Sequence, residues 1–324
     1  MDPRAGADAV PGADAVPGAD LVVGLDVGGT KLAVRAETVD GSPVADVTVA
    51  ASGWSATPAG SAALWISGHL SRCLPAGARV VAAGIGAQGC DSAQICSDLR
   101  QALAATGITA VVVNDGALLV PAAGLDAGIG IVAGTGSIAV GTSSSGEILL
   151  AGGWGWVIGD EGGAAAIVRE ATRAALTAHD EGLADDGLLA ALLEAFGVDA
   201  LRAGGGAVER LTRLVNDEPT VENWAPRAPA VFAAAEAGSG LAMAVIEAAA
   251  ADLAGLARRL RARGAVGNAV VAGGSVVTRQ PLLARALEAQ LRLVDADLEL
   301  RVLAEEPVAG AVVLARRLGS SLAK

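Results

Sequence analysis

One short segment, Asp26-Val27-Gly28-Gly29-Thr30-Lys31, constrains the fold more than any other part of the chain. It lies between the apolar runs 21–25 and 32–35 and predicts two strands joined by a glycine turn. Because glycine has no Cβ, such a turn can bring backbone N–H groups close to phosphate oxygens, with the carboxylate beside a hydrated cation. An ordinary Gly-Gly hairpin fits this segment alone equally well, so other segments must decide.

The glycine spacing argues against two common phosphate-binding motifs. In the stretch 24–31 the glycines have Walker A spacing, but Thr30 precedes Lys31, whereas a P-loop places Ser or Thr after its lysine. The dinucleotide fingerprint needs G-x-G-x-x-G before a helix, and here a second strand-like run follows the glycines. The sequence therefore disfavours both a P-loop and nicotinamide chemistry.

Composition and charge limit the possible partners. At 324 residues and 52% hydrophobic content the chain can bury a large core, and its length suggests about two domains. The aromatic share is only 2%, so we expect a helix-rich core packed around small residues. A net charge of -12 without clustered Arg or Lys argues against nucleic acid and favours a small-molecule partner.

The sequence predicts neither a membrane segment nor a cysteine-based metal site. The apolar run 127–141 is too short and too rich in glycine to span a bilayer. Cys73, Cys90 and Cys96 are odd in number and lack zinc-finger spacing, as expected for reduced thiols. We therefore expect a cytoplasmic protein without a membrane partner.

Apolar periodicity predicts two echoing sets of strands after a low-complexity tail. Residues 6–20 repeat Gly-Ala-Asp-Ala-Val-Pro, and we expect residues 1–19 to form a flexible tail. The strand-like runs lie at 21–26, 32–36, 80–85 and 109–113 in the first set and at 129–133, 137–141 and 269–272 in the second. From residue 162 the pattern is mainly helical; the clearest helix, 241–263, has an apolar stripe and a basic end that complements its dipole.

Two further glycine loops follow strand-like runs. Gly134-Thr135-Gly136-Ser137 predicts a hairpin tip whose free N–H groups can clamp a phosphate. Val271-Ala272-Gly273-Gly274-Ser275 precedes a helix predicted from Arg279 to Leu293, so a flat ring or a ribose can approach its backbone. Three such loops in two echoing halves favour phosphate binding over chance turns, and we expect their tips to meet across one crevice.

The order of these loops, with Asn114-Asp115-Gly116 between the first two, resembles that of the superfamily of sugar kinases, Hsp70 and actin. Gly152-Gly153-Trp154-Gly155-Trp156-Val157-Ile158-Gly159-Asp160-Glu161-Gly162 resembles the signature of N-acetylglucosamine and glucosamine kinases among the activase-like ATPases. Pro307-Val308-Ala309-Gly310-Ala311 is similar to their closing helix. The likeness spans residues 20–318.

The resemblance implies an α/β protein with a two-lobed actin-like ATPase (ribonuclease H-like) fold of duplicated mixed sheets. Residues 20–116 plus 308–324 would form the small lobe, and residues 117–307 the large lobe with helical insertions. ATP and Mg²⁺ would bind in the cleft, with closure around the sugar. A homodimer is a further expectation from the family.

The resemblance also assigns the nucleotide contacts. Asp26 would hold hydrated magnesium, and the ATP phosphates would be bound by Gly28, Gly29, Thr30, Gly134, Thr135, Gly136 and Ser137. The adenosine would be flanked by Gly273, Gly274 and Ser275. Lys31 follows the first turn and could face either a phosphate or solvent, and the sequence leaves both open.

Asp115 matches the family's catalytic base, which aligns the sugar 6-hydroxyl and accepts its proton late in an in-line transfer. In isolation, Asn-Asp-Gly would instead be interpreted as a turn, but its place between two phosphate loops favours catalysis. The implied sugar contacts are Gln88, Asp91, Asn114, Thr135, Gly153, Trp154 and Asp160. Asp160 would accept hydrogen bonds from sugar hydroxyls through both oxygens.

Two neighbouring residues are interpreted differently. We expect Trp156 to pack in the core. Glu161 could support magnesium or Asp160, or could stabilise the N-terminus of a helix that starts near Gly162.

Asp91 bears on which amino sugar is bound. An acidic residue at this place would pair with a free ammonium group, whereas an N-acetyl group needs an apolar slot and a neutral donor. Asp91 therefore favours glucosamine, although it could equally cap the helix that runs through residues 97–105. We predict a glucosamine kinase, with N-acetylglucosamine kinase as the alternative.

Two other functional classes fit less well. An activase-type ATPase needs cysteine thiolates for an iron-sulfur cluster, but Cys90 and Cys96 precede the Asn-Asp-Gly turn instead of following the second phosphate loop. A sugar-sensing repressor needs a helix-turn-helix ahead of the fold, which residues 1–20 cannot form.

Overall fold

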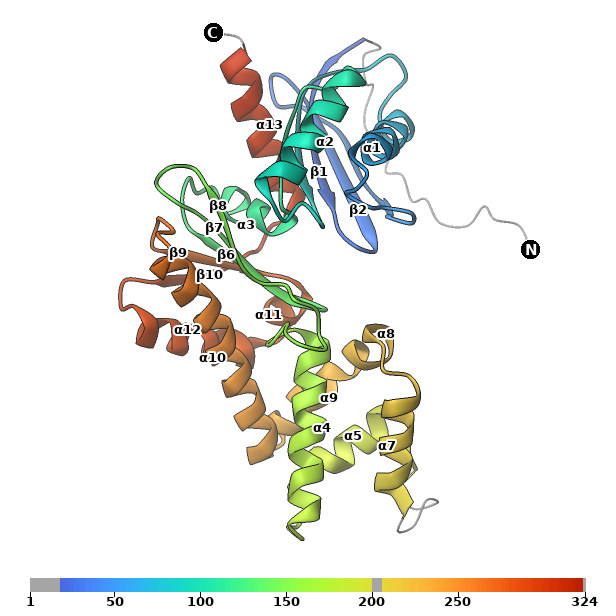
Figure 1. The fold of residues 1–324 in the computed structure, drawn as a ribbon, viewed down its shortest axis with the longest axis vertical. Coiled ribbons are helices and arrows are strands. Elements are labelled where there is room, and N and C mark those ends of the chain that lie inside the picture. The colour runs from blue at the N-terminus through green and yellow to red at the C-terminus, as the bar shows by residue number, and fades with distance from the viewer. Residues whose placement is uncertain (1–17, 200–205, 323–324) are drawn as a thin grey trace, which may run out of the picture. The chain divides into compact units, whose positions relative to one another are not determined.

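The computed structural model describes residues 18–199 and 206–322, and the chain forms two compact units (Figure 1). Unit 1 comprises the chain up to Asp126 together with the segment from Leu303 onward, and unit 2 comprises Ala127–Val302. Each unit is built on one mixed five-stranded sheet with helices, which confirms the predicted α/β fold. Most of the tail predicted over residues 1–19 lies outside the described residues.

The sheet of unit 1 combines an antiparallel meander with two parallel strands. β1 pairs antiparallel with β2 and parallel with β4. Across the sheet the order is β3 (Pro43–Ala50), β2 (Lys31–Thr38), β1 (Asp20–Val27), β4 (Arg79–Ala87) and β5 (Ala110–Val113). β1 is buried along almost its whole length because helices cover both of its faces.

The described residues of unit 1 form the helices α1 (Ala59–Cys73), α2 (Ala93–Ala105), η1 (Asp115–Leu118), α3 (Leu119–Ala122) and α13 (Val308–Leu322). Leu21, Val23 and Leu25 of β1 share a hydrophobic core with α1 and α2. Since side chains alternate along a strand, the other face is left to α13, which packs against β1 and β4. Its backbone comes so close that a Cβ on Gly84 would lie 2.0 Å from the carbonyl oxygen of Ala311.

The boundary between the units lies beyond the position expected from the sequence. η1 and α3 pack against α13, so the chain stays in unit 1 up to Asp126 and does not leave it at residue 116. The chain returns to unit 1 at Leu303, a few residues before the start of α13.

The sheet of unit 2 repeats the arrangement of unit 1. β6 pairs antiparallel with β7 and parallel with β9. The order is β10 (Glu299–Val302), β9 (Ala269–Gly273), β6 (Ile129–Ala133), β7 (Ser137–Thr142) and β8 (Ile148–Gly152). The prediction of two echoing strand sets is therefore confirmed.

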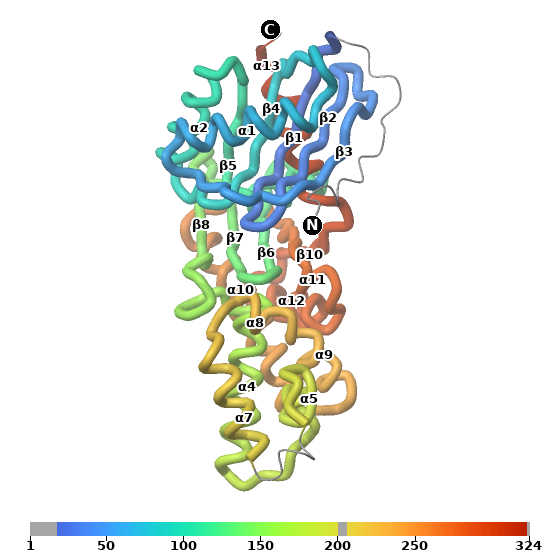
Figure 2. Tube along the Cα trace, turned by 90° about the vertical axis from the view of Figure 1, so that its right-hand side faces the viewer, coloured from blue at the N-terminus to red at the C-terminus, as the bar shows by residue number. Residues whose placement is uncertain are grey.

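Unit 2 carries more helical structure than unit 1. Its elements are α4 (Ala164–Asp180), α5 (Leu188–Ala195), α7 (Ala207–Asp217), α8 (Val221–Trp224), η3 (Ala225–Arg227), α9 (Ala228–Glu236), α10 (Gly240–Ala262), α11 (Ser275–Arg279) and α12 (Pro281–Val294). α10 packs on β6, β7, β8 and α12. Helices α4, α5, α7, α8 and α9 gather at the end of this unit (Figure 2).

α10 is the helix predicted at 241–263. Leu253, Leu256 and Leu260 on its apolar side belong to the hydrophobic core of unit 2. Among the described residues it is the one helix whose length and hydropathy would allow it to cross a membrane, although much of it is buried inside the protein.

The helix predicted from Arg279 to Leu293 is α12, and a short helix that was not predicted, α11, precedes it. α11 begins directly at Ser275, and α12 begins at Pro281. Proline cannot continue a helix that precedes it, because its ring removes a backbone donor and disfavours helical conformation in the residue before it. β3, β8 and β10 are further elements that are not predicted from the sequence.

Candidate active site

The first glycine turn joins β1 to β2 in unit 1. It is closed by a hydrogen bond from the Gly28 N–H to the carbonyl oxygen of Lys31, at 2.9 Å. Gly29, Thr30 and Lys31 are exposed. The turn therefore presents open backbone at the place where the sequence predicts phosphate binding.

Asp26 lies near the end of β1, just before this turn. Burial, and then the negative charges of Asp115 and Glu306, raise the pKa of Asp26 to about 7. In the described part of the chain, no group of three or more His, Cys, Asp or Glu side chains could hold a metal ion. The donor set still fits magnesium, which keeps several waters and is commonly bound by one or two carboxylates together with substrate phosphates.

Asp115 begins η1, and one residue, Asn114, separates it from the end of β5. The Asx turn expected of this segment is made by Asn114, which is 1% exposed and whose Oδ1 accepts a hydrogen bond from the Gly116 N–H at 2.9 Å. Burial is the main cause that raises the pKa of Asp115 to about 6. The hydrogen bond from the Gly116 N–H lowers this pKa, and the negative charge of Asp91 raises it. Such a carboxylate is suited to accepting a proton near neutral pH.

Asp91 does not cap α2, which corrects one of the two roles considered for it. The N-cap is Ser92, whose hydroxyl accepts a hydrogen bond from the Ile95 N–H at 3.2 Å. Asp91 Oδ1 accepts instead from Asn114 Nδ2, at 2.8 Å. The fold of unit 1 thus brings two predicted sugar contacts together next to Asp115.

Gln88 follows β4 and lies against the first glycine turn. Its N–H donates to the carbonyl oxygen of Val27 at 2.8 Å, and its own carbonyl oxygen accepts from the Trp54 indole at 3.1 Å. A Cβ on Gly29 would lie 2.6 Å from Gln88 Oε1. A predicted sugar contact therefore occupies the space beside a predicted phosphate contact.

The second glycine turn joins β6 to β7 in unit 2. The Gly134 N–H donates to the carbonyl oxygen of Gly136 at 3.0 Å, and Thr135 is exposed at the tip. Ser137 is 5% exposed, and its hydroxyl donates to the carbonyl oxygen of Glu161 at 2.7 Å. The Ser137 hydroxyl is therefore engaged within the fold, whereas that of Thr135 faces solvent.

The third glycine loop lies beside the second. Gly274 has a φ of 99°, and a Cβ on it would lie 2.6 Å from the carbonyl oxygen of Ala133. A Cβ on Gly134 would lie 3.7 Å from the Ser275 nitrogen. Glycine at position 274 therefore allows the two backbones to approach, and two predicted nucleotide loops are neighbours in unit 2.

The tryptophan-containing segment begins in a tight turn at Gly152 and Gly153, both with positive φ. Trp154 is 73% exposed and lines a groove of about 800 Å³ with Ile158 and residues of α10. Trp156 packs against Trp224, with 5.2 Å between ring centroids, as expected for a core residue. Sugar contacts by Gly153 and Trp154 stay predictions.

The sequence matches the model of the BadF/BadG/BcrA/BcrD ATPase family over residues 23–315. The chain belongs to this family. The matched range includes the three glycine loops, Asp115 and the tryptophan-containing segment. Family membership thus agrees with the resemblance inferred from the motifs.

A relative with a named activity aligns over a shorter stretch of this ATPase family member. The N-acetylmuramic acid/N-acetylglucosamine kinase of Clostridium acetobutylicum is 34% identical over 116 residues, which are 35% of this chain. The alignment spans only 37% of that kinase's own length.

Solved structures share the fold of the family member described here. A proposed N-acetylglucosamine kinase from Chromobacterium violaceum has a TM-score of 0.68 at 24% identity, covering 92% of this chain and 100% of that one. A proposed N-acetylglucosamine kinase from Porphyromonas gingivalis has a TM-score of 0.58 at 17% identity, with coverages of 91% and 99%. A ROK family glucokinase from Streptomyces griseus, solved with glucose and AMPPNP, has a TM-score of 0.51 at 20% identity. The match covers 91% of this chain and 98% of that one. The fold is that of the actin-like sugar kinases.

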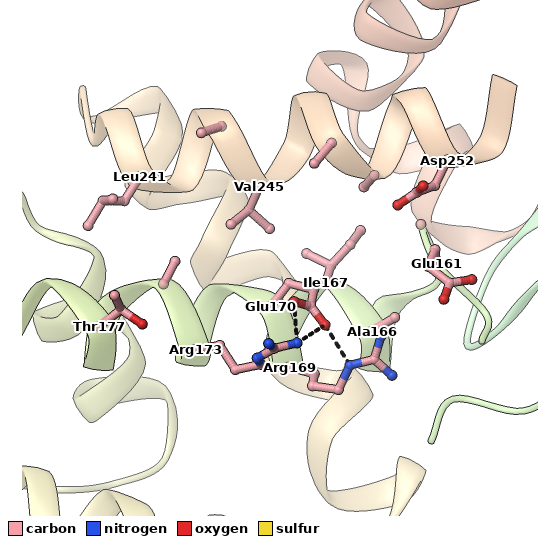
Figure 3. A pocket seen from close by; sticks show the side chains of 15 residues that line it. Glu161, Ala166, Ile167, Arg169, Glu170, Arg173, Thr177, Leu241, Val245 and Asp252 are labelled. Carbon is pink, nitrogen blue, oxygen red and sulfur yellow. Dashed lines mark hydrogen bonds and ion pairs between the residues drawn. The ribbon is translucent and has the colours of Figure 1, made fainter. Parts of the chain in front are cut away.

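A cavity of about 590 Å³ lies between α4 and α10 (Figure 3). On α4, Arg169 and Arg173 form ion pairs with Glu170 along its rim. Glu161 and Asp252 lie at one end. Burial raises the pKa of Asp252, and the charge of Glu161 raises it further.

Two residues near the predicted site were missed by sequence reasoning. Trp54 holds the carbonyl group of Gln88, and Glu306 is one of the charges that raise the pKa of Asp26. Glu306 directly precedes the Pro307 motif, which was a usable signal, whereas nothing in the sequence around Trp54 points to Gln88.

Proposed function

We propose that this chain is an ATP-dependent kinase that transfers the γ-phosphoryl group of ATP to the 6-hydroxyl of an amino sugar. The observation that carries the proposal is the carboxylate pair in unit 1. Asp26 on β1 and Asp115 at the start of η1 lie on elements that pack together, and the charge of Asp115 adds to the effect of burial in raising the pKa of Asp26. One carboxylate placed for a cation and one placed for a proton match the needs of in-line phosphoryl transfer to a hydroxyl.

The proposed roles follow from the local geometry. Asp26 would hold hydrated magnesium, which neutralises charge on the phosphate oxygens when bound. Exposed backbone of the turns 28–30 and 134–136 would bind phosphate oxygens. The loop 273–275, whose backbone packs closely against the second turn, would flank the adenosine. Asp115 would orient the 6-hydroxyl and accept its proton while the new O–P bond forms and ADP leaves.

Glucosamine is the acceptor that the side chains favour. Asp91 uses one carboxylate oxygen for Asn114, and no cation is paired with it among the described residues. Asp91 is exposed, and a free ammonium group at C2 would place a positive charge beside it, whereas an N-acetyl group would add no charge. N-acetylglucosamine is the second candidate, because the aligned kinase of C. acetobutylicum carries that name.

ADP release in a coupled assay with magnesium, ATP and a panel of sugars tests the proposal. Glucosamine should give the highest kcat/KM, and Asp91→Asn should lower that value by roughly tenfold with little effect on N-acetylglucosamine. A strong preference of the wild type for N-acetylglucosamine would overturn the choice of sugar and leave the kinase intact. Absence of ADP release with every sugar, together with protein-bound iron, would point to an activase-type ATPase instead.

A further inference from the structure

Asp160 has an unusual backbone conformation. Its φ of 58° is the one positive φ at a non-glycine position in the described ranges 18–199 and 206–322. This left-handed region is sparsely used by residues with a Cβ, and aspartate is among the few that tolerate it. Such a conformation persists only where surrounding contacts fix it.

The Asp160 carboxylate is directed at the second glycine turn. Oδ1 accepts a hydrogen bond from the Gly155 N–H at 3.2 Å, and the Ser137 N–H also donates to the carboxylate. A Cβ on Gly136 would lie 2.3 Å from Oδ2. The carboxylate therefore occupies the space that any side chain at position 136 would need.

Backbone hydrogen bonds near Asp160 also connect its segment to the second glycine turn. The Gly163 N–H donates to the carbonyl oxygen of Asp160 at 2.9 Å, and the Ala164 N–H donates to that of Gly134 at 2.8 Å. The start of α4 is thereby fixed beneath the turn. Of the four N–H groups of residues 134–137, those of Gly134 and Ser137 are bound internally, and those of Thr135 and Gly136 have no hydrogen-bond partner in the described chain.

We propose that Asp160 is a positioning residue that holds the turn 134–137 in its nucleotide-binding conformation, whether or not a sugar is present. The inference rests on the proposed function, because it assumes that this turn binds ATP phosphates. It differs from the role predicted from the family signature, in which both carboxylate oxygens accept hydrogen bonds from sugar hydroxyls. Here both oxygens already lie against backbone of unit 2.

The two roles predict different measurements. A residue that only binds sugar changes the KM for sugar and leaves nucleotide affinity without sugar unchanged. A residue that positions the turn weakens nucleotide binding in the absence of sugar, because part of the binding energy must then order the turn. Nucleotide affinity without sugar is therefore the deciding quantity.

Three variants test the proposal by calorimetric titration with Mg·ADP and no sugar. Asp160→Asn keeps the shape but loses an acceptor, and Asp160→Gly removes the carboxylate while suiting the positive φ. Gly136→Ala displaces the carboxylate from the opposite side. Each should weaken Mg·ADP binding by about tenfold, the usual scale of a lost hydrogen bond to a charged group, with the wild-type unfolding transition retained by Asp160→Gly.

Asp252→Asn is the matched control, since it removes another carboxylate of unit 2 whose pKa is raised by burial. It should bind Mg·ADP as the wild type does. The double variant Gly136→Ala/Asp160→Gly should bind no more weakly than Asp160→Gly, because the atoms that the new Cβ meets are gone.

The outcomes separate the inference from the proposed function. Wild-type affinity in Asp160→Gly or in Gly136→Ala overturns the positioning role. If the wild type itself does not bind Mg·ADP, the proposed function fails as well. If the wild type binds and only the KM for sugar changes in the variants, Asp160 is a sugar contact and the positioning role is wrong.

Discussion

In both units a glycine turn joins an antiparallel strand pair, β1 and β2 in one and β6 and β7 in the other, next to a parallel neighbour. The acidic groups are placed differently. In unit 1, Asp26 and Asp115 lie at or just after strand ends. In unit 2 the corresponding strands, β6 and β10, end at Ala133 and Val302, and the carboxylate of Asp160 comes from the connection after β8.

This difference shows how a repeated backbone arrangement can serve two purposes. The carboxylates of unit 1 are half-buried with raised pKa values, and the proposed function assigns them to a cation and a proton. The carboxylate of unit 2 is bound by backbone N–H groups and shapes a turn. We infer that unit 1 carries the acid-base chemistry and that unit 2 holds the nucleotide mainly through its backbone.

The largest expected effect comes from Asp115→Asn, which removes the proposed base from unit 1 and leaves unit 2 unchanged. The value of kcat should fall by about 10²–10⁴-fold, the usual contribution of general-base catalysis. The Kd for ADP should stay within about threefold of the wild-type value, because only transition-state interactions are lost. Steady-state kinetics and calorimetry measure both.

Asp126→Asn is the control for this variant, since its exposed carboxylate pairs with Arg317 in the same unit. It should leave kcat unchanged. Equal loss of turnover and ADP binding in Asp115→Asn would break the proposed division between the units and would indicate a structural role for Asp115.

A second prediction compares buried strand glycines, one in each unit. In Gly84→Ala the new Cβ would meet backbone atoms of α13, whereas in Gly141→Ala it would lie 3.1 Å from the Ala265 Cβ, where a small shift suffices. Gly84→Ala should lower the free energy of unfolding by about 3 kcal/mol and Gly141→Ala by about 1 kcal/mol or less. Urea denaturation measures both. Similar losses would mean that α13 yields as readily as the side chains around Gly141.

A third prediction uses pH to test the buried charge of unit 1. The pKa of Asp26 rises from 3.8 to about 7 on folding, so the folded state holds this proton more tightly than the unfolded state. The metal-free protein should therefore lose stability as pH rises from about 4 to about 7. Asp26→Asn should remove much of this loss and be more stable than the wild type above pH 7 by on the order of 1–4 kcal/mol.

Urea denaturation at pH 5 and pH 8 without magnesium checks the sign. Asp126→Asn again serves as the control and should follow the wild type at both values. If Asp26→Asn is no more stable than the wild type at pH 8, the carboxylate is not buried at an energetic cost, and the contrast between the units weakens.

The smallest expected effect concerns Lys31, which is exposed at the start of β2. If its ammonium group faces the ATP phosphates, Lys31→Gln should raise the KM for ATP by about threefold at low salt, and the difference should shrink at high salt. Initial rates measured at two ionic strengths give the KM for ATP of both proteins and so test this expectation. An unchanged KM at low salt would assign this side chain to solvent and leave the first turn to act through backbone alone.

The central strands could be predicted from the sequence, and three edge strands could not. β1, β4, β6 and β9 are continuous apolar runs because they are covered or paired on both sides. β3, β8 and β10 lie at sheet edges. β3 and β10 carry polar residues such as Asp46 and Glu299, which weaken their apolar signal, whereas β8 is apolar but only five residues long.

The glycine loops of the candidate site could also be predicted from the sequence, because each directly follows an apolar strand. Contacts between separate segments were not. The pairing of Asp91 with Asn114, and the placement of Asp160 against Gly136, depend on how distant parts of a unit fold together. The helix cap was misassigned because Asp91 and Ser92 are both good N-cap residues and only the structure separates them.

The packing of α13 sets an order for biosynthesis. The ribosome makes β1 to β5 first and then the whole of unit 2 before it makes the helix that covers β1 and β4. Unit 2 can complete its core while the sheet of unit 1 still has an uncovered apolar face. The nascent chain therefore passes through a stage at which this face is open to chaperones or to aggregation, until the last helix emerges.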